Sequence, residues 1–438
     1  MAQEKQQNRW TRVIGALLVQ LALGCIYAWS VFNKPLASQL EEPAKSLQVL
    51  GIFATSLAAF GLSVQLGGRM QDKRGPRDIA ILSGVVYAAG YLMSWQFNDS
   101  MPMMYLSYAV LGMGVGIGYS CPLSCCIKWF PDKKGLVSGI SVAGFGAGTF
   151  IFAQVAQYII DQAASPAEGL SAAYLYLGII FLFMVAIGAL FLTDPPAGYC
   201  PLGWTPPKEG AGSIAKKQFR PGEMVKTRSF ILLWTMFVLS ATCGLMMIGN
   251  VSNVAQNLED IFAAKHPGFN PATDNVMVTG QVATMTGILA VFNGAGRIAW
   301  GFISDRIGRT KAMKVMFLTQ AVILFSAAGF ILSKPTDEVL AFLGLTALVS
   351  LVGFCFGGNF ALFPPTTSEY FGNKYFGNNY GIVFTSYAVG GVIGGLMPGI
   401  IKGGFEWVFI ATAVGSLVAF MLAWVTGPPK VESEAPSA

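Results

Sequence analysis

Arg297 is the residue whose type and position in this sequence point most directly to chemistry. It stands inside a long apolar segment, eight residues before the polar residue Asp305. On a helix, eight residues place it ~12 Å from that polar end. A charge at that depth in an apolar phase costs at least ~2.5–3.5 kcal/mol, and such residues usually face a cavity. No Asp or Glu stands in the middle of an apolar segment, so we expect Arg297 to bind an anion, and its planar fork matches a carboxylate.

Asn293 stands one helical turn before Arg297 and therefore on the same face of the helix. Its amide can orient the guanidinium or donate to the anion, or it can make a simple contact between helices. For Arg297 the alternative is a structural arginine that reaches back to water or bonds backbone carbonyls. Its depth and the lack of a carboxylate partner favour the anion site.

Aromatic residues recur at helical spacing in four other apolar segments. Tyr119 follows Gly112 and Gly116, a spacing typical of helices that pack closely through small residues, and a buried phenol needs a hydrogen-bond partner. Aromatic residues at such spacing more often pack against neighbouring helices than line a pocket. The other candidate pocket residues in these segments are Tyr27, Phe356, Phe360, Phe384 and Tyr387.

Composition indicates what kind of chain holds these residues. Of 438 residues, 54% are hydrophobic and 11% are charged, and the mean hydropathy is +0.57. Soluble domains carry about 25% charged residues, so a soluble enzyme, a nucleic-acid-binding protein and a disordered chain are excluded. The seven cysteines and one histidine show no metal-ligand spacing, and no nucleophile–base pair is present. We expect a polytopic membrane protein that is not an enzyme and uses no metal or cofactor.

A helix needs about 20 apolar residues to cross a bilayer. Lys and Arg are unevenly distributed between the connecting segments, with 22 on the side of the N-terminus and five on the other side. Because basic residues accumulate on the cytoplasmic side, both termini are expected in the cytoplasm. The sequence predicts an all-α protein with twelve transmembrane helices, over residues 11–33, 48–69, 78–98, 102–127, 135–163, 172–193, 229–254, 275–303, 313–333, 337–364, 377–402 and 405–426.

The longest stretch without an apolar segment, residues 194–228, contains six prolines and six basic residues. This composition is typical of a linker. The linker is expected in the cytoplasm, where it divides the spans six and six. The predicted organisation is an N-terminal six-helix half (1–193), the linker (194–228), a C-terminal six-helix half (229–426) and a cytoplasmic tail (427–438).

The two halves repeat a loop motif. Gly68-x-x-x-Asp72 with basic residues follows the second segment, and Gly301-x-x-x-Asp305 with basic residues follows the eighth, 233 residues further on. The Gly can permit a close helix approach, and the Asp can pair with basic groups or a helix N-terminus to hold a gate closed. The alternative is that these charges only set topology. The expected gating residues are Gly68, Asp72, Arg74, Gly301, Asp305 and Arg309.

A second repeat relates the fourth and fifth segments to the tenth and eleventh. Its register places Tyr119 near Phe360 and Phe145 on Tyr387. Repeats of this kind are typical of secondary transporters, whose substrate binds between the repeats near the middle of the bilayer.

The twelve segments, the basic linker and the duplicated loop motif resemble the major facilitator superfamily. Longer strings resemble the oxalate:formate antiporter family of bacteria and the related monocarboxylate carriers, among them Gly24-Cys-Ile-Tyr27-Ala-Trp29, Phe292-Asn-Gly-Ala-Gly-Arg297 and Asn379-Tyr-Gly381. The resemblance implies two six-helix halves around a cavity that opens alternately to each side. It also implies that the arginine binds the substrate carboxylate in a chamber lined by Tyr387, Phe360, Phe356 and Phe384.

The sequence departs from this family at one informative position. In the exchangers a lysine on the eleventh span joins the arginine of the eighth, and that position is Tyr387 here. One cation neutralises a monocarboxylate but leaves a dicarboxylate with an unpaired buried charge. We expect a secondary transporter of small monocarboxylates such as lactate, pyruvate or formate. An oxalate:formate antiporter and a non-transporting membrane sensor are the alternatives.

The sequence leaves the coupling mechanism open. Animal monocarboxylate carriers have an Asp one turn before the arginine, where this chain has Asn293. Anion exchange and proton symport, with the proton carried by substrate or water, are both compatible with it. We further expect a multi-pass monomer in the plasma membrane of a bacterium or archaeon. Its expected partners are the lipid bilayer, a monocarboxylate and, for symport, a proton, and no nucleic acid.

Overall fold

The computed structural model describes residues 9–130, 134–196, 199–201, 217–265, 276–335, 337–372 and 375–429. All regular elements in these ranges are helices. In chain order they are α1 (Trp10–Gly24), η1 (Cys25–Ala28), α2 (Trp29–Gln39), α3 (Leu47–Arg74), α4 (Pro76–Gln96), α5 (Met101–Trp129), α6 (Lys134–Gln162), α7 (Pro166–Phe191), α8 (Pro221–Met224), α9 (Arg228–Lys265), α10 (Val276–Ile307), α11 (Arg309–Leu332), α12 (Glu338–Phe371), α13 (Phe376–Ile400) and α14 (Phe405–Val425).

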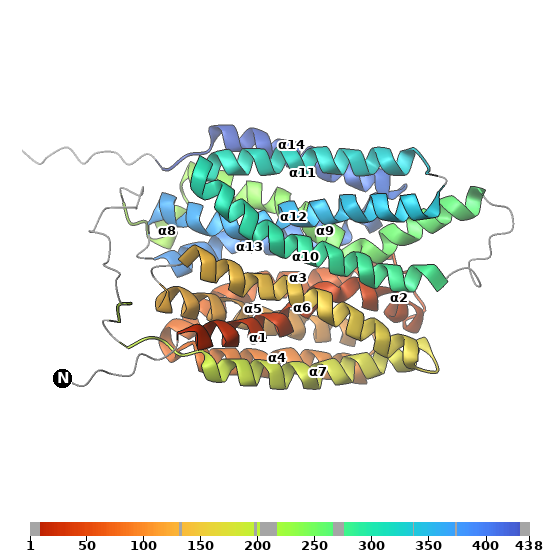
Figure 1. Ribbon diagram of the computed structural model, residues 1–438, viewed down its shortest axis with the longest axis horizontal. Helices are drawn as coiled ribbons and strands as arrows, with labels where there is room; N and C mark the ends of the chain where they lie inside the picture. The colour runs from red at the N-terminus through yellow and green to blue at the C-terminus, as the bar shows by residue number, and fades with distance from the viewer. Residues whose placement is uncertain are drawn as a thin grey trace, which may run out of the picture.

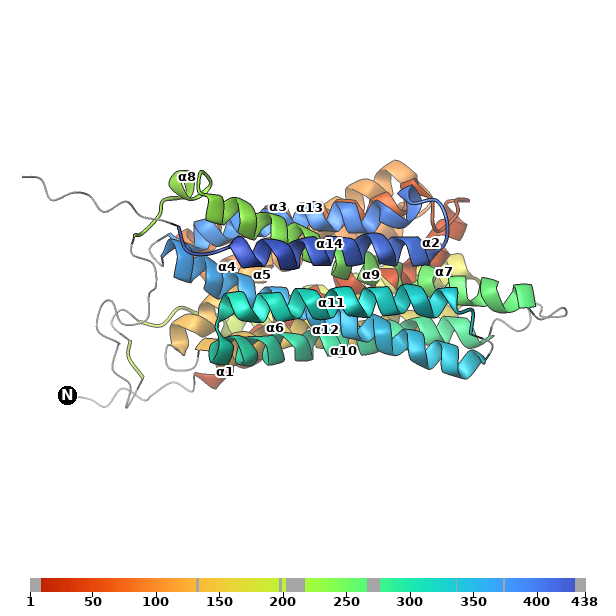
Figure 2. The ribbon, with the colours of Figure 1, turned by 90° about the horizontal axis from the view of Figure 1, so that it is seen from above.

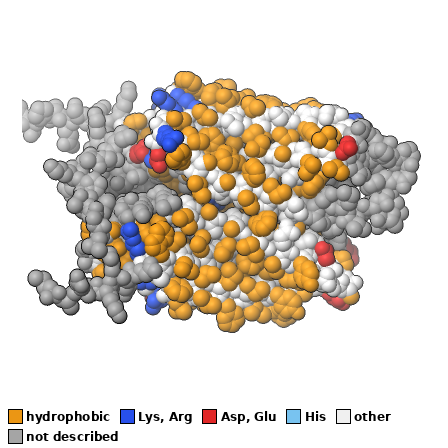
Figure 3. All heavy atoms as spheres, viewed as in Figure 1, with side chains coloured by type: hydrophobic (Ala, Val, Ile, Leu, Met, Phe, Trp, Pro, Cys, Tyr) orange, Lys and Arg blue, Asp and Glu red, His pale blue; other side chains and the backbone are white. Residues whose placement is uncertain are grey.

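Twelve helical stretches in the described ranges are long and apolar enough to cross a membrane, with α1, η1 and α2 counted as one. Each overlaps one of the twelve predicted segments, so the prediction of an all-α fold with twelve spans is confirmed. Figure 3 shows hydrophobic side chains over the flank of the bundle and charged side chains towards its two ends. This distribution suits a flank that contacts lipid.

The long helices run side by side in two groups. In Figure 1, α1–α7 occupy the lower part of the bundle and α9–α14 the upper part. The short helix α8 lies at the same end as the start of α1 and the end of α14, and we call this the linker end (Figures 1 and 2). The orientation of the linker end towards the cytoplasm remains a prediction from the charge distribution.

The two groups meet mainly along two helix pairs, α3 with α13 and α6 with α10. Small residues let these backbones approach. A Cβ added to Gly61 would lie 2.7 Å from the Cβ of Ala388, and one added to Gly146 would lie 2.7 Å from the carbonyl oxygen of Ala290. Inside a bilayer, where burial gives little driving force, close packing of this kind holds helices together.

Alternate glycines of α5 pack against two different neighbours. A Cβ on Gly112 would overlap the carbonyl oxygen of Ser56 in α3, whereas one on Gly114 would lie 2.5 Å from the backbone nitrogen of Tyr87 in α4. The glycine-rich stretch is therefore a packing surface, as its spacing predicted.

The first span of each group is bent. In the first group η1 interrupts the span at Cys25–Ala28, and in the second group Asn250 in α9 has non-helical dihedral angles (φ −128°, ψ 17°). Just before η1, a Cβ on Gly24 would overlap the carbonyl oxygen of Phe145 in α6. A 3₁₀ stretch inside a helix often marks a functional position, and here it contains the buried Tyr27.

We expect Gly112→Ala to destabilise the protein by about 1–3 kcal/mol, because the added methyl group would force α3 and α5 apart. Gly329→Ala in α11 is the matched control, since no described atom lies within 4 Å of the position that its Cβ would take. Thermal unfolding in detergent should show a lower midpoint for Gly112→Ala alone. Equal midpoints for the two variants would contradict the close-packing interpretation.

Candidate functional site

Arg297 lies on α10 between the two groups of helices and is 4% exposed. Its Nε donates a hydrogen bond to Oδ1 of Asn293 (3.1 Å), and its Nη1 donates to the carbonyl oxygen of Val142 in α6 (3.1 Å). The bond to Val142 crosses from one group of helices to the other. A guanidinium has five N–H groups, and the phenol of Tyr119 is a third hydrogen-bond partner, so two N–H groups are left. The structural alternative for this arginine was a hydrogen bond to a backbone carbonyl. That bond uses only one of the five N–H groups.

The charge of Arg297 has no carboxylate partner in the part of the chain that the structure describes. Its Cζ lies 4.3 Å from the ring centroid of Phe360 and 5.8 Å from that of Phe145. Cation–π attraction offsets part of the cost of burial but supplies no negative charge. The ion pairs found among the described residues lie elsewhere: Lys128–Asp194, Lys217–Glu223, Asp305–Arg309 and Arg309–Glu369.

A pair of tyrosine hydroxyls also crosses the interface, beside the arginine. The hydroxyl oxygens of Tyr27 in η1 and Tyr387 in α13 lie 2.7 Å apart, and both side chains are buried. The ring of Tyr27 lies 5.1 Å from that of Phe145, and the ring of Tyr387 lies 6.1 Å from that of Phe360. The tyrosine pair therefore contacts the same two rings as Arg297.

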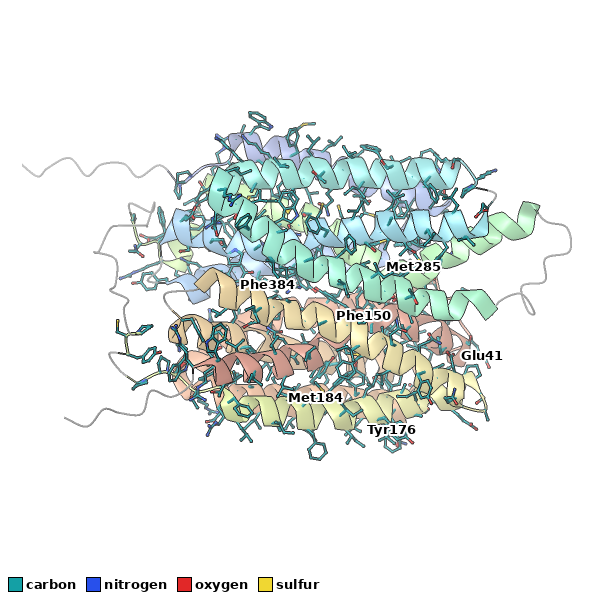
Figure 4. All side chains as sticks on the ribbon, in the orientation of Figure 1. Glu41, Phe150, Tyr176, Met184, Met285 and Phe384 are labelled. Carbon is teal, nitrogen blue, oxygen red and sulfur yellow. The ribbon has the colours of Figure 1, made fainter. Side chains whose placement is uncertain are left out.

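Eight rings connect these groups, with neighbouring ring centroids 5.0–6.5 Å apart; Phe237 and Tyr380 adjoin Phe384 at the edge of the cluster and are not counted among the eight. Four rings come from the first group of helices and four from the second. Figure 4 shows Phe384, one of the eight, where the two groups meet. We call this cluster the aromatic chamber: Tyr27, Phe60, Tyr119, Phe145, Phe356, Phe360, Phe384 and Tyr387.

The structure brings together all eight residues predicted from the sequence for a substrate site. Arg297 bonds Asn293, and the other six are rings of the aromatic chamber. Sequence reasoning missed Phe60 and Phe145 as chamber residues. The internal repeat could have identified Phe145, which aligns with Tyr387, whereas Phe60 lies in an apolar segment with no distinguishing feature.

At the linker end, the second copy of the loop motif forms a network of ion pairs. Arg309 donates through Nη1 to Oδ1 of Asp305 (2.6 Å) and through Nε to Oε1 of Glu369 (3.0 Å), and it also contacts Ser304. The network joins α10, α11 and α12 within one group of helices. Glu369 was not predicted, because a single acid near the end of a span belongs to no motif.

The role expected for the motif glycines is corrected by the structure. No described atom lies within 4 Å of the position that a Cβ would take at Gly68, and at Gly301 the Cβ of Ala361 lies 3.7 Å away. Neither glycine is therefore required for a close helix approach. Arg74 is exposed, and the side chain of Asp72 is outside the described residues.

Neighbouring residues of the first motif make the contact between the two groups at the linker end. Arg69 donates through Nη2 and Gln65 through Nε2 to the same Oδ1 of Asn378 in α13, each at 3.1 Å. Sequence reasoning missed this contact. Its acceptor is a neutral amide, so it can be exchanged for water at small cost.

The last part of the linker packs on the second group of helices. The backbone nitrogen of Phe219 donates to the carbonyl oxygen of Phe371 (2.9 Å), and Nδ2 of Asn379 donates to the carbonyl oxygen of Phe219 (3.0 Å). Beside it, the backbone N–H of Arg220 donates to Oε2 of Glu223 (2.9 Å) and holds the pKa of that carboxyl below its ordinary value. This segment therefore ties the chain just before α8 to the C-terminal end of α12 and the start of α13.

Comparisons with known proteins agree with this architecture. The family model of the Major Facilitator Superfamily matches residues 13–395 and 279–438. The oxalate:formate antiporter of Oxalobacter formigenes is 32% identical over 425 residues, covering 95% of this chain and 91% of that protein. Apicoplast pyruvate carrier 1 of Toxoplasma gondii is 25% identical, covering 87% of this chain and 82% of that protein. The xylose transporter XylE of E. coli, in a partially occluded inward-open conformation, superposes with a TM-score of 0.69 at 12% identity, covering 96% of this chain and 99% of that one.

The fold and these matches define the class of protein: a multi-pass secondary transporter, not an enzyme. The chain belongs to the Major Facilitator Superfamily. Within the superfamily it is similar to the oxalate:formate antiporter over nearly its whole length, so the resemblance seen in the sequence is confirmed.

We expect Asp305→Asn to lower the rate of transport about two- to fivefold, because Arg309 loses one of its two carboxylate partners and the network that joins α10, α11 and α12 at the linker end is weakened. Substrate affinity should change less. Asp194→Asn is the matched control, since it removes an ion pair with Lys128 (2.9 Å) in the other group of helices. Initial rates in proteoliposomes at equal protein density measure both. A normal rate for Asp305→Asn would leave this charge with a role in topology only.

Proposed function

We propose that this protein transports small monocarboxylate anions, lactate-like acids first, by alternating access. The observation that carries the proposal is the buried Arg297 guanidinium between the two groups of helices, which has no carboxylate partner among the described residues. Its remaining N–H groups can hold a carboxylate in bidentate geometry. The names of two relatives, an oxalate:formate antiporter and a pyruvate carrier, support small organic anions as the substrate class.

The charge of the chamber favours a single carboxylate. Among the described residues, Arg297 is the ionised group at the aromatic chamber, where it contacts the rings of Phe145 and Phe360 and bonds the neutral Asn293. Tyr387 bonds Tyr27 through its phenol and is uncharged near neutral pH. One guanidinium neutralises one negative charge, and the second charge of a dianion would be buried without a partner. Oxalate:formate exchange is the second candidate, favoured by the 32% identity to the antiporter of Oxalobacter formigenes.

The hydrogen bond from Arg297 to the carbonyl oxygen of Val142 gives anion binding a way to act on the two groups of helices. A carboxylate is a stronger acceptor than a carbonyl oxygen and competes for the same guanidinium. Occupancy of the site then changes a contact that crosses the interface. A ligand shifts a conformational equilibrium by its difference in affinity for the two states, and this contact supplies such a difference.

Coupling follows from the neighbour of the arginine. Oδ1 of Asn293 accepts from Arg297, and an amide does not titrate. Exchange of one monoanion for another needs no titrating group beside the arginine. Proton symport is compatible with Asn293 when the proton travels on the substrate or on water. We place the protein as a monomer in the plasma membrane of a bacterium or archaeon, with the linker end in the cytoplasm.

Arg297→Ala should reduce the uptake of labelled lactate into proteoliposomes by about 10- to 100-fold, the loss expected when a charged hydrogen-bonding group is removed. Arg297→Lys keeps the charge but loses the planar fork, and it should also lose most of the uptake. The matched control is Arg77→Ala, which removes an exposed guanidinium that bonds the carbonyl oxygen of Leu190. Wild-type uptake by folded Arg297→Ala protein would refute the anion site.

Oxalate should compete poorly for lactate uptake by the wild-type protein, with an inhibition constant at least about tenfold above that of unlabelled lactate, because its second charge finds no second cation. Competition assays on labelled lactate uptake measure this ratio. Displacement by oxalate at equal or lower concentration would favour the antiporter. A folded protein that takes up none of lactate, pyruvate, formate or oxalate would favour the membrane sensor.

A further inference from the structure

We propose that the hydroxyl pair of Tyr27 and Tyr387 is a second recognition element, which selects monocarboxylates with an oxygen on carbon 2. These are 2-hydroxy and 2-oxo acids. The inference rests on the proposed function, because it assigns the carboxylate of the same substrate to Arg297. It goes further by assigning residues to the neighbouring oxygen.

The hydrogen-bond count of the pair leaves one proton unused. The two hydroxyl oxygens are 2.7 Å apart, so one O–H donates to the other oxygen. The accepting tyrosine still has its own O–H, and the described residues provide no second partner for either hydroxyl. A buried polar group without an acceptor costs about 1–3 kcal/mol. The count is the same for the buried pair of Tyr108 and Tyr174, so what distinguishes the pair of Tyr27 and Tyr387 is its position beside Arg297, where a ligand could use the free O–H.

The surroundings of the pair do not supply that acceptor. Tyr27 packs edge-on against Phe145 at 5.1 Å, and Tyr387 stacks on Phe384 at 5.0 Å and meets Phe60 at 5.0 Å. These phenylalanine rings have no oxygen or nitrogen. Water or a ligand can accept, and an anion bound at Arg297 would bring a ligand to these rings.

The pair and the arginine are placed to hold one short ligand. Arg297 and Tyr27 both contact the ring of Phe145, and Arg297 and Tyr387 both contact the ring of Phe360. In a 2-hydroxy or 2-oxo acid, a single C–C bond separates the carboxylate from the oxygen-bearing carbon. A carboxylate on the guanidinium therefore brings this oxygen towards the tyrosine pair. Formate, acetate and propionate have no such oxygen.

A second tyrosine pair in the same protein shows what a purely structural pair looks like. The hydroxyls of Tyr108 in α5 and Tyr174 in α7 lie 3.0 Å apart, and both side chains are buried. That pair lies within one group of helices, outside the aromatic chamber. Tyr174→Phe therefore removes a hydroxyl from a buried tyrosine pair without touching the proposed site.

The test compares three acids that share a three-carbon skeleton and one negative charge: lactate, pyruvate and propionate. Their binding to the purified full-length protein in detergent is measured by calorimetry. We expect the wild-type protein to bind lactate and pyruvate about 10- to 100-fold more tightly than propionate, the range that corresponds to one unsatisfied buried donor. In Tyr27→Phe/Tyr387→Phe the preference should fall to within about twofold, and propionate binding should be kept. Tyr174→Phe should show the wild-type preference.

The outcomes separate this inference from the proposed function. Equal binding of all three acids by the wild-type protein overturns the inference and leaves the monocarboxylate site standing. The inference is also overturned if the double variant keeps the wild-type preference, or if its affinity for all three acids falls in equal proportion. Either result would mean that the tyrosine pair only holds the two groups of helices together. No binding of any acid by the wild-type protein overturns both. The wild-type comparison needs no substitution, so the inference stays testable even where the double variant does not fold.

Discussion

A guanidinium held between two groups of helices without a carboxylate is the constraint on which the rest of this structure depends. An isolated charge is costly to bury unless it is paired and hydrogen-bonded. Among the described residues, the partners of Arg297 include the amide of Asn293, the carbonyl oxygen of Val142, the phenol of Tyr119 and the faces of Phe145 and Phe360. These partners reduce the cost of burial but leave the net charge intact. The site can therefore exist empty and still gain from an anion.

Close backbone packing holds the arginine in place. A Cβ on Gly296, the residue before Arg297, would overlap the carbonyl oxygen of Phe354 in α12, and one on Gly357 would overlap the carbonyl oxygen of Asn293. The backbones of α10 and α12 therefore nearly touch on both sides of the arginine. Because α12 also supplies Phe360, this crossing brings an aromatic face to 4.3 Å from the guanidinium. The position of the charge is set by glycines that make no contact with it.

Much of the site followed from the sequence because its features are local. A basic residue in an apolar segment and aromatic residues at helical spacing are visible without knowing the neighbours, which is why Arg297 and Tyr119 could be selected. Phe60 could not be selected, because the contacts that place it in the chamber are with other helices. The motif glycine Gly68 was misinterpreted for the same reason, since the sequence does not show whether a neighbouring helix passes close to a glycine. Hydrogen bonds across the interface, such as Arg69 to Asn378, depend on packing between spans far apart in the chain.

The hydrogen bonds described across the interface have neutral acceptors, whereas none of the ion pairs found among the described residues joins the two groups. Ser30 and Thr286 share one hydroxyl hydrogen bond (2.7 Å) across the interface, and the tyrosine pair of the chamber shares another. A neutral hydrogen bond is worth about 0.5–1.5 kcal/mol net, so water can replace these at small cost when the groups move. The ion pair of Arg309 with Glu369, by contrast, lies within one group and moves with it.

This division gives the substrate a defined part in closing the interface. The charged donors that cross it in the described structure, Arg297 and Arg69, both bond neutral acceptors, a backbone carbonyl and the amide of Asn378. Among the described residues, neither of these two positive charges at the interface is matched by a negative charge. In the function proposed above, a monocarboxylate at the chamber would supply that charge, and hydrogen bonds between ionised partners are about twice as strong as neutral ones. On that proposal the loaded interface gains more from closing around Arg297 than the empty one does, which would tie the movement of the two groups to the presence of an anion.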